Sequence, residues 1–418
     1  MSSIVVAGDV SGAISIAAPS AAGSGTLTLP VATDTLVGKA TTDTLTNKTL
    51  VNPTITGLQT LNTPNTFGFK NRIINGGMVI DQRNAGASVT VTTGGGYIYP
   101  VDRFGNFNNS GTNYAAEQVE DAPAGFYQST KLTFASAISL TTQNEATFFQ
   151  IIEGNNMVDL GWGTANAQTV TVGMWVKASF TGTFSIGFCN DGGTRAYATT
   201  YTISAANTWE YKTFTIAGDT SGTWLKTNGA GLFVRWNIVA GSNFQVSANN
   251  AWATRAGAYN DADGIYGTKA IGAASSISAG ATWQITGVQL EKGSTDTSFD
   301  FRAFPTELAM CQRYFQVLAS GTNKVIGMGW YWTATELDVT IPLITTMRAA
   351  PSLLITTGTN YYKYIRTSDL FDSLTIDGQE TTDAVNLYTQ TGVSGTVGLA
   401  SAVSTNNALA FIGFTSEL

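Results

Sequence analysis

Apolar and polar residues alternate along most of the chain, which predicts β-strands. Val170, Val172, Met174 and Val176 share one parity, as expected for a strand with one face in a core. Clusters of Gly, Asn and Asp separate such stretches, as in proteins built from many short strands. Phe148–Ile152 fits either a strand or a short helix. The strands predicted before residue 303 include Ser88–Thr92, Lys131–Phe134, Thr169–Ala178, Thr183–Phe188, Thr213–Ala217, Gly231–Ile238 and Thr282–Leu290.

The last of these strands changes parity halfway along. Trp283 and Ile285 share one parity, and Val288 and Leu290 share the other, with Gly287 between them. A glycine inside a strand often marks a bulge, whose extra residue exchanges the two faces. A strand buried on both faces would give the same pattern. The sequence leaves both interpretations open.

A short helix is predicted after this strand, and more strands follow it. Pro305 and Thr306 are typical helix-start residues, and Leu308, Cys311 and Phe315 form one apolar stripe at helical spacing. The later strands are predicted at Leu337–Ile341, Leu353–Thr356, Tyr361–Arg366, Val385–Thr389 and Ala408–Phe414.

Residues 1–66 differ from the rest because they contain almost no aromatic side chains. Thr33–Leu36 is repeated as Thr42–Leu45, and isolated Ile, Leu and Val residues lie in a Thr-rich chain. Such a segment cannot build a compact core alone, but identical neighbours could bury these side chains in a thin intertwined stalk. A flexible linker is the alternative.

These patterns predict an all-β protein. We expect a thin N-terminal stalk segment at residues 1–66 and a jelly-roll-like β-sandwich at 67–303. A smaller C-terminal β domain, opened by the short helix, should occupy 304–418.

Composition narrows the classes of function. Only 12% of the 418 residues are charged, and the net charge of −7 comes without a basic run, so we expect no nucleic-acid partner. The absence of histidine excludes His-based triads and His-containing metal sites. Cys189 and Cys311 are expected to be buried thiols, although a disulfide stays open. No signal peptide or membrane-spanning segment is predicted, so we expect no membrane insertion.

Few motifs suggest chemistry. Asp261–Gly264 spaces two carboxylates as some calcium loops do, but it lacks the rest of an EF-hand, so an Asp/Gly turn is favoured and no metal or cofactor is expected. Glu145, Glu153 and Asp159 are candidate carboxylates for glycoside hydrolysis, without a local signature. We therefore expect no enzyme activity.

Two aromatic clusters in the C-terminal region are the candidate glycan-binding residues. Adjacent strand residues point to opposite faces, so each cluster should expose at least one ring unless it is covered. Exposed rings can stack on the apolar faces of sugars, whereas core or subunit packing is the alternative. The candidates are Trp330, Tyr331, Trp332, Tyr361, Tyr362 and Tyr364.

Several motifs resemble those of bacteriophage tail-fibre and receptor-binding proteins. The segments Asn71–Met78, Asp81–Arg83 and Val101–Phe104 are similar to the opening of the sandwich in that family, and Thr44–Leu50 and Thr346–Pro351 resemble other fibre segments. The match to the closing strand and the helix that follows it comprises Trp283, Ile285, Gly287, Val288, Gln289, Leu290, Glu291, Gly293, Thr297, Phe299, Arg302, Glu307, Leu308, Cys311, Arg313 and Tyr314.

The resemblance implies a jelly roll like that of carbohydrate-binding modules, and a homotrimeric tail fibre of a phage virion that is assembled in the host cytoplasm. The fibre would be elongated, with residues 1–66 as its virion-attachment segment and residues 304–418 as its distal domain. Its N-terminus would attach to a tail adaptor or to a baseplate or nozzle protein, and its β domains would bind a bacterial surface polysaccharide. A fibre or decoration protein elsewhere on the virion, such as the head, is the first alternative. A fibre-borne glycan depolymerase is the second.

Overall fold

The computed structural model describes seven stretches of the chain, which divides into two compact units, residues 1–61 and 62–418. In the first unit, β1 (Ser3–Ala7) pairs with β2 (Ala13–Ala17) in antiparallel register. The expectations about the stalk, and Asp261–Gly264, lie outside the described residues. The described stretches are 3–7, 13–17, 69–139, 141–246, 249–254, 267–268 and 276–418.

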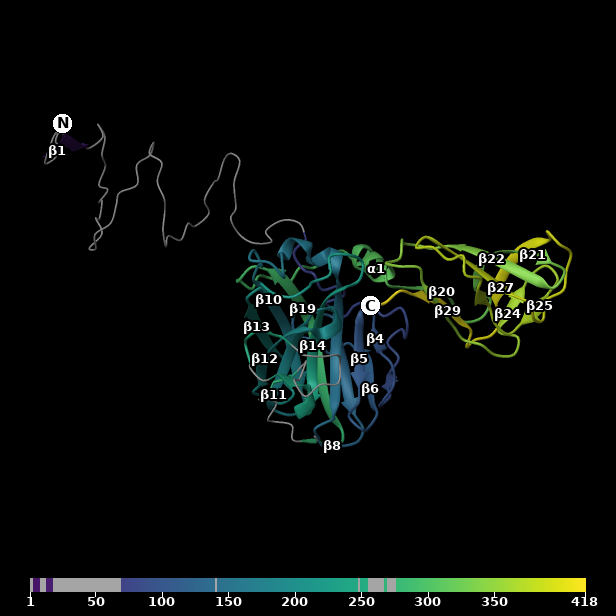
Figure 1. The fold of residues 1–418 in the computed structure, drawn as a ribbon, viewed down its shortest axis with the longest axis horizontal. Helices are drawn as coiled ribbons and strands as arrows, with labels where there is room; N and C mark the ends of the chain where they lie inside the picture. The colour runs from purple at the N-terminus through teal and green to yellow at the C-terminus, as the bar shows by residue number, and fades with distance from the viewer. Residues whose placement is uncertain are drawn as a thin grey trace. The chain divides into compact units, whose positions relative to one another are not determined.

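Two antiparallel sheets form a β-sandwich in the second unit (Figure 1). The six-stranded sheet has the order β13 (Glu210–Ile216), β10 (Val170–Ala178), β19 (Ala281–Lys292), β7 (Ser129–Phe134), β6 (Tyr114–Val119) and β3 (Val89–Val91). The seven-stranded sheet has the order β16 (Ala253–Thr254), β12 (Arg195–Ile203), β11 (Gly182–Cys189), β14 (Ala230–Ala240), β9 (Glu145–Glu153), β5 (Phe104–Asn108) and β4 (Ile98–Val101).

Smaller elements complete the sandwich. Two short pairs join β15 (Gln245–Val246) to β17 (Gly267–Thr268) and β8 (Ile138–Ser139) to β18 (Ser276–Ile277). The 3-10 helices are η1 (Gly154–Leu160), η2 (Asp191–Gly193) and η3 (Ser242–Phe244).

The inward residues of both sheets share one large core. Trp283 of β19 and Phe148 of β9 meet across the two layers with ring centroids 5.8 Å apart. Both rings are fully buried, as are the alternating Val170, Val172 and Met174 of β10. The period-2 pattern therefore placed the core face of β10 correctly. Phe148–Ile152 lies within β9, so the strand alternative is the correct one there.

The parity change in β19 comes from a bulge at Gly287. Gly287 has a φ of +61°, and the register against β10 shifts between Gly173 and Trp175. The extra residue keeps both Trp283 and Val288 in the sandwich core. The opposite face is buried as well, because Gln289 and Glu291 hydrogen-bond to the connector that follows. Both alternatives left open by the sequence thus apply to this strand.

The helix α1 (Phe304–Gln312) begins where the sequence predicted it, with Pro305 in its first turn. Cys311 is buried on its inner face. The expectation for Phe315 was wrong, because the helix ends before Arg313 and Phe315 starts the strand β20 (Phe315–Ser320). Helix α1 has nine residues, and none of the helices in the described ranges is long and apolar enough to cross a membrane.

Two further antiparallel sheets follow α1 and enclose a second core. The three-stranded sheet has the order β20, β29 (Phe411–Thr415) and β23 (Ser352–Ile355). The seven-stranded sheet has the order β25 (Asp369–Phe371), β24 (Tyr362–Tyr364), β28 (Ala400–Thr405), β21 (Val325–Thr333), β22 (Glu336–Pro342), β27 (Ala384–Thr389) and β26 (Thr375–Ile376). The all-β prediction is confirmed; the domain boundaries at 66 and 303 stay predictions.

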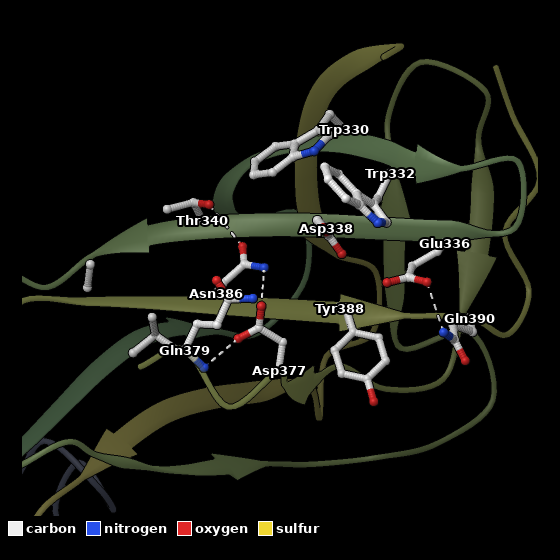
Figure 2. A pocket seen from close by; sticks show the side chains of 12 residues that line it. Trp330, Trp332, Glu336, Asp338, Thr340, Asp377, Gln379, Asn386, Tyr388 and Gln390 are labelled. Atoms are coloured by element: carbon white, nitrogen blue, oxygen red, sulfur yellow. Dashed lines mark hydrogen bonds between the residues drawn. The ribbon is translucent and has the colours of Figure 1, made fainter. Parts of the chain in front are cut away.

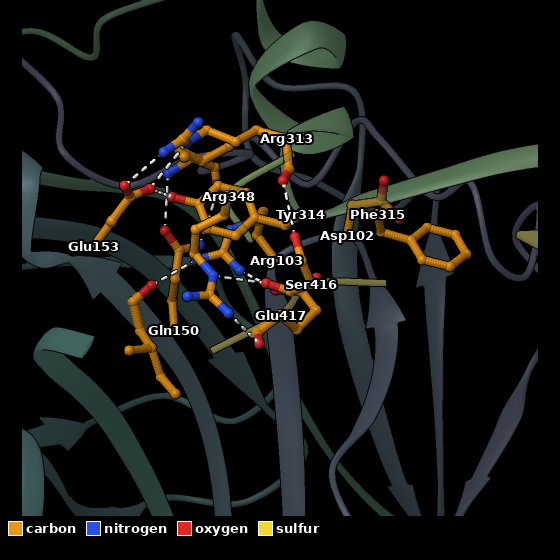
Figure 3. A network of polar contacts seen from close by, with 12 residues as sticks. Asp102, Arg103, Gln150, Glu153, Arg313, Tyr314, Phe315, Arg348, Ser416 and Glu417 are labelled. Atoms are coloured by element: carbon orange, nitrogen blue, oxygen red, sulfur yellow. Dashed lines mark hydrogen bonds and ion pairs between the residues drawn. The ribbon is translucent and has the colours of Figure 1, made fainter. Parts of the chain in front are cut away.

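A buried polar network joins the sandwich residues to α1 and to the C-terminal residues (Figure 3). Arg103, only 2% exposed, donates to the Glu417 carboxylate and to the Ile151 carbonyl oxygen, and its guanidinium lies over the Tyr314 ring. Arg313 donates to Glu153 at 2.7 Å. Burial opposes ionisation of Glu153, but hydrogen bonds from Arg313 and Tyr314 outweigh it, so its pKa is lowered.

The first prediction concerns the partner of Arg103. Replacing Glu417 by Gln leaves a buried guanidinium without its carboxylate, and losing one partner of a buried pair costs about 3–5 kcal/mol. We expect a lower midpoint in urea-induced unfolding. Glu120→Gln removes an exposed carboxylate and should change the free energy of unfolding by less than about 0.5 kcal/mol. Equal midpoints for both variants would contradict a stabilising role for the pair.

The second prediction is a pH dependence at Asp102. Burial raises the pKa of this carboxyl to about 7, although Arg83 and Gln82 favour its charged form. The folded state therefore holds a proton that the unfolded state, with a pKa near 3.8, releases. This contribution to stability is complete below the unfolded pKa and is lost as pH rises through the folded pKa.

Asp102→Asn removes this proton uptake. The stability advantage of the wild type over the variant should shrink as pH rises from about 4 to about 7, by at most about 1.4 kcal/mol per pH unit. Urea unfolding of both proteins at a series of pH values measures this difference in the free energy of unfolding. Parallel stability profiles would show that Asp102 ionises normally in the fold.

Candidate functional site

The candidate site lies on the outward face of the C-terminal seven-stranded sheet. Side chains alternate between two faces along each strand. On β22, Leu337 and Val339 point into the second core, so Asp338 between them lies on the outward face. On β21, the buried Tyr331 separates Trp330 from Trp332 in the same way.

Strand register brings a polar and aromatic row together on this face. Trp330 of β21 lies opposite Asp338 of β22, and Asp338 lies opposite Tyr388 of β27. Directly opposed side chains have Cβ atoms about 4.5–5.5 Å apart. Thr340 lies opposite Asn386 in the neighbouring row, and their side-chain oxygens are 2.9 Å apart. The consecutive strands β21 and β22 and the distant strand β27 therefore supply one surface.

This face is hollowed into a groove of about 670 Å³, shown in Figure 2. Trp332, at 63% exposure, is the most exposed aromatic side chain among those we proposed for glycan binding, and Trp330 beside it is half-buried. The groove is lined by Trp330, Trp332, Glu336, Asp338, Thr340, Asp377, Gln379, Ala384, Val385, Asn386, Tyr388 and Gln390.

Amide groups hold two of the groove's carboxylates in place. Asn386 donates to Asp377 at 2.7 Å, and the backbone N–H of Gln379 donates to the same carboxylate at 2.9 Å. Gln390 donates to Glu336 at 2.9 Å. These bonds fix the carboxylates without neutralising them, so the groove keeps its negative charge.

Asp338 is the most buried of these carboxylates, with 8% of its surface exposed. Burial raises its pKa, and the negative charges of Glu336 and Asp377 raise it further, while a hydrogen bond from Asn386 lowers it. Its position in the row between Trp330 and Tyr388 places this carboxylate between two rings. The groove therefore combines aromatic faces with oriented oxygen acceptors.

The structure separates the six sequence-predicted residues into two groups. Trp330 and Trp332 line the groove. Tyr331, Tyr362 and Tyr364 are fully buried in the second core, which corrects their assignment as ligand contacts. Their hydroxyls bond internally to the Asp369 carboxylate, the Thr356 carbonyl and the Leu399 carbonyl respectively.

Tyr361, the remaining candidate, is half-buried and packs against the second core, and it does not line the groove. Side chains alternate between the two faces of a strand, so every second residue of an aromatic run packs into the core. In β24, Tyr362 and Tyr364 are the residues that face inward.

Sequence reasoning missed the polar half of the groove. The Glu-Leu-Asp-Val-Thr-Ile sequence of β22 contained a signal, because the parity that excludes Leu337 and Val339 selects Glu336, Asp338 and Thr340. Nothing in the sequence paired this strand with Tyr388 or Asp377, which belong to a distant segment. Only the sheet order brings them together.

The carboxylates considered for glycoside hydrolysis have structural partners. Glu153 binds Arg313 and Tyr314, Asp159 lies 2.8 Å from Arg72, and Glu145 lies 4.0 Å from Arg235. In the described part of the chain, no group of three or more His, Cys, Asp or Glu side chains could hold a metal ion. Cys189 and Cys311 are both buried.

The segments that resemble phage fibres hold the fold around β19. Asn71 donates to the Val288 carbonyl at 3.1 Å and accepts from the Leu290 N–H at 3.1 Å. A Cβ on Gly76 would lie 2.1 Å from the Val288 carbonyl oxygen, so no larger residue fits there. Arg302 pairs with Glu307 at 3.3 Å. These motifs contribute to packing and do not form the groove.

No protein-family model and no curated protein matches this sequence. Solved structures show distant similarity to the fold. The enzymatically active domain of tailspike protein 4 from bacteriophage CBA120 is 15% identical with a TM-score of 0.28; the match covers 53% of this chain and 21% of that one.

Two sugar-binding proteins are similar at the same level. A putative sugar-binding protein from Bacteroides thetaiotaomicron is 11% identical with a TM-score of 0.28, covering 54% of this chain and 100% of that one. A family 11 carbohydrate-binding module from Clostridium thermocellum, in complex with a mixed-linked tetrasaccharide, is 8% identical with a TM-score of 0.25. That match covers 50% of this chain and 98% of that one. The chain is thus distantly similar in structure to carbohydrate-binding β-sandwiches and to a phage tailspike domain.

Proposed function

We propose that this protein is an adhesive component of a phage virion that binds a bacterial surface glycan through the groove on β21, β22 and β27. The observation that carries the proposal is the groove itself, in which Trp330 and Trp332 stand beside amide and carboxylate groups. Aromatic rings pack against the apolar faces of sugar rings, and the polar groups accept and donate hydrogen bonds to hydroxyls.

The geometry suits an extended glycan better than a small buried ligand. The groove lies along a sheet face and is bordered by strands, and two indoles follow each other at alternate positions of β21. One sugar offers little contact area, so affinity per groove should be weak. Several copies on one particle would raise avidity through effective concentration.

The proposal also places the protein on a phage virion. It rests on the fibre-like motifs at both ends of the sandwich. We propose a homotrimeric tail fibre whose N-terminal residues attach to a tail adaptor, baseplate or nozzle protein. A decoration protein on the head is the alternative location. The protein acts in binding rather than in catalysis.

Glycan depolymerisation is the second candidate function, and one observation favours it. The groove holds Asp338, a carboxyl with a raised pKa, beside the carboxylates of Glu336 and Asp377. Glycoside hydrolases use one protonated and one ionised carboxyl across the scissile bond. Release of reducing ends from host polysaccharide would distinguish an enzyme from a binder.

The third prediction tests the groove. Trp332→Ala removes an exposed ring, so the free energy of unfolding should change by less than about 0.5 kcal/mol. Loss of one stacking contact of about 1–1.5 kcal/mol should reduce glycan affinity about tenfold per groove. Binding of labelled protein to host cells and thermal unfolding should be measured on the same preparations.

Tyr127→Ala provides the matched control, because Tyr127 is an aromatic residue with 62% exposure on the sandwich. It should leave cell binding unchanged. Loss of cell binding in the Tyr127 variant but not in the Trp332 variant would move the receptor site to the sandwich. Retained binding in both would remove the groove from the proposal.

The fourth prediction concerns the N-terminal residues. Deleting residues 1–66 should leave the β domains folded, because both described cores lie after residue 72. It should also abolish incorporation into particles and reduce the mass measured by light scattering from trimer to monomer. Truncated protein that still assembles onto virions would contradict the attachment role, and a monomeric full-length chain would contradict the trimer.

A further inference from the structure

We propose that the groove on β21, β22 and β27 selects a cationic sugar, namely a glycan residue that carries a protonated amino group. This inference rests on the proposed glycan-binding function and adds the chemical class of the ligand. An amino sugar without an N-acetyl group offers both features that the groove complements, a sugar ring and a positive charge.

The charges of the groove are all of one sign. Glu336, Asp338 and Asp377 are among its lining residues, and that lining includes no lysine or arginine. Within the described ranges, none of these three carboxylates forms an ion pair, unlike Glu153 and Asp219, which bind arginines. Their hydrogen-bond donors are neutral amides. An incoming cation would therefore meet negative charge that the protein leaves uncompensated.

Asp338 indicates where that cation would sit. It is more than nine-tenths buried, and it lies directly between Trp330 and Tyr388 in the cross-strand row. A buried carboxylate without a cation costs free energy, and an ammonium group supplies three N–H donors and a compensating charge. The same ammonium group beside an indole gains a cation–π interaction.

Other ligand classes fit this surface less well. A uronic or sialic acid would bring a further carboxylate beside three others, and like charges repel. A neutral sugar would cover Asp338 without supplying a countercharge. A lysine side chain of a peptide has the right charge but offers no sugar face to the two indoles.

The experiment measures binding of monosaccharides to the full-length protein by saturation-transfer NMR, which needs no knowledge of linkage. The probes are glucosamine, N-acetylglucosamine, glucose and glucuronate, together with the same four derivatives of galactose and with lysine amide. We expect the amino sugars to bind about tenfold or more tighter than their N-acetylated and neutral counterparts. Added salt should weaken binding of the amino sugars more than that of glucose.

Charge-removing variants locate the preference in the groove. Asp338→Asn and, separately, Asp377→Asn should lower the ratio of amino-sugar affinity to neutral-sugar affinity at least several-fold, because each removes one negative charge from the groove. Asp338→Asn should not lower the melting temperature, because it relieves repulsion by Glu336 and Asp377. Glu120→Gln, which removes one exposed carboxylate from the sandwich, should leave the preference intact.

The outcomes distinguish failure of the cationic ligand from failure of the glycan-binding function. Equal or tighter binding of neutral, N-acetylated or acidic sugars that is lost in Trp332→Ala would overturn the cationic ligand and keep the glycan-binding function. No binding of any sugar by the wild type would overturn both. Binding of lysine amide without binding of amino sugars would replace the glycan with a basic peptide. An amino-sugar preference unchanged in both aspartate variants would place the cation site elsewhere.

Discussion

The strict alternation of side chains along a β-strand is the constraint on which the candidate site depends. In β21 it directs Tyr331 into the second core and leaves Trp330 and Trp332 on the opposite face. In β22 it separates Leu337 and Val339 from the carboxylate of Asp338. A slip of one residue in either strand would reverse both arrangements, burying charge and exposing the core. The packing of the core and the presence of the groove therefore depend on the same register of β21 and β22.

The groove differs in kind from the polar networks elsewhere in the protein. Around α1 and the C-terminal residues, buried charges have opposite partners, as in the pairs of Arg103 with Glu417 and Arg313 with Glu153. Such pairs hold segments together, and their carboxylates are not available to a ligand. In the groove, neutral amides orient the carboxylates and no arginine or lysine lines the site. Unpaired charge at a concave aromatic surface is typical of a binding site.

The motifs that resemble phage fibres and the residues proposed to bind a ligand occupy different parts of the chain. Gly76, Asn71 and Gln289 are required by close backbone approach and by hydrogen bonds around β19. They support the fold, and they do not identify a ligand. The groove arises from ordinary strands whose outward residues carry no recognisable motif.

The sequence by itself determined the fold class, the core face of β10 and the start of α1, because each follows from local periodicity or from one residue's backbone preference. It left the bulge at Gly287 as one of two interpretations, and the backbone conformation of the folded strand decided for it. It also selected Trp330 and Trp332. Local pattern could not show that Tyr362 and Tyr364 both face the core, or that Phe315 begins a strand. Only the tertiary structure placed Tyr388 and Asp377 beside Asp338, because the sheet order joins strands that are separated by some fifty residues of sequence.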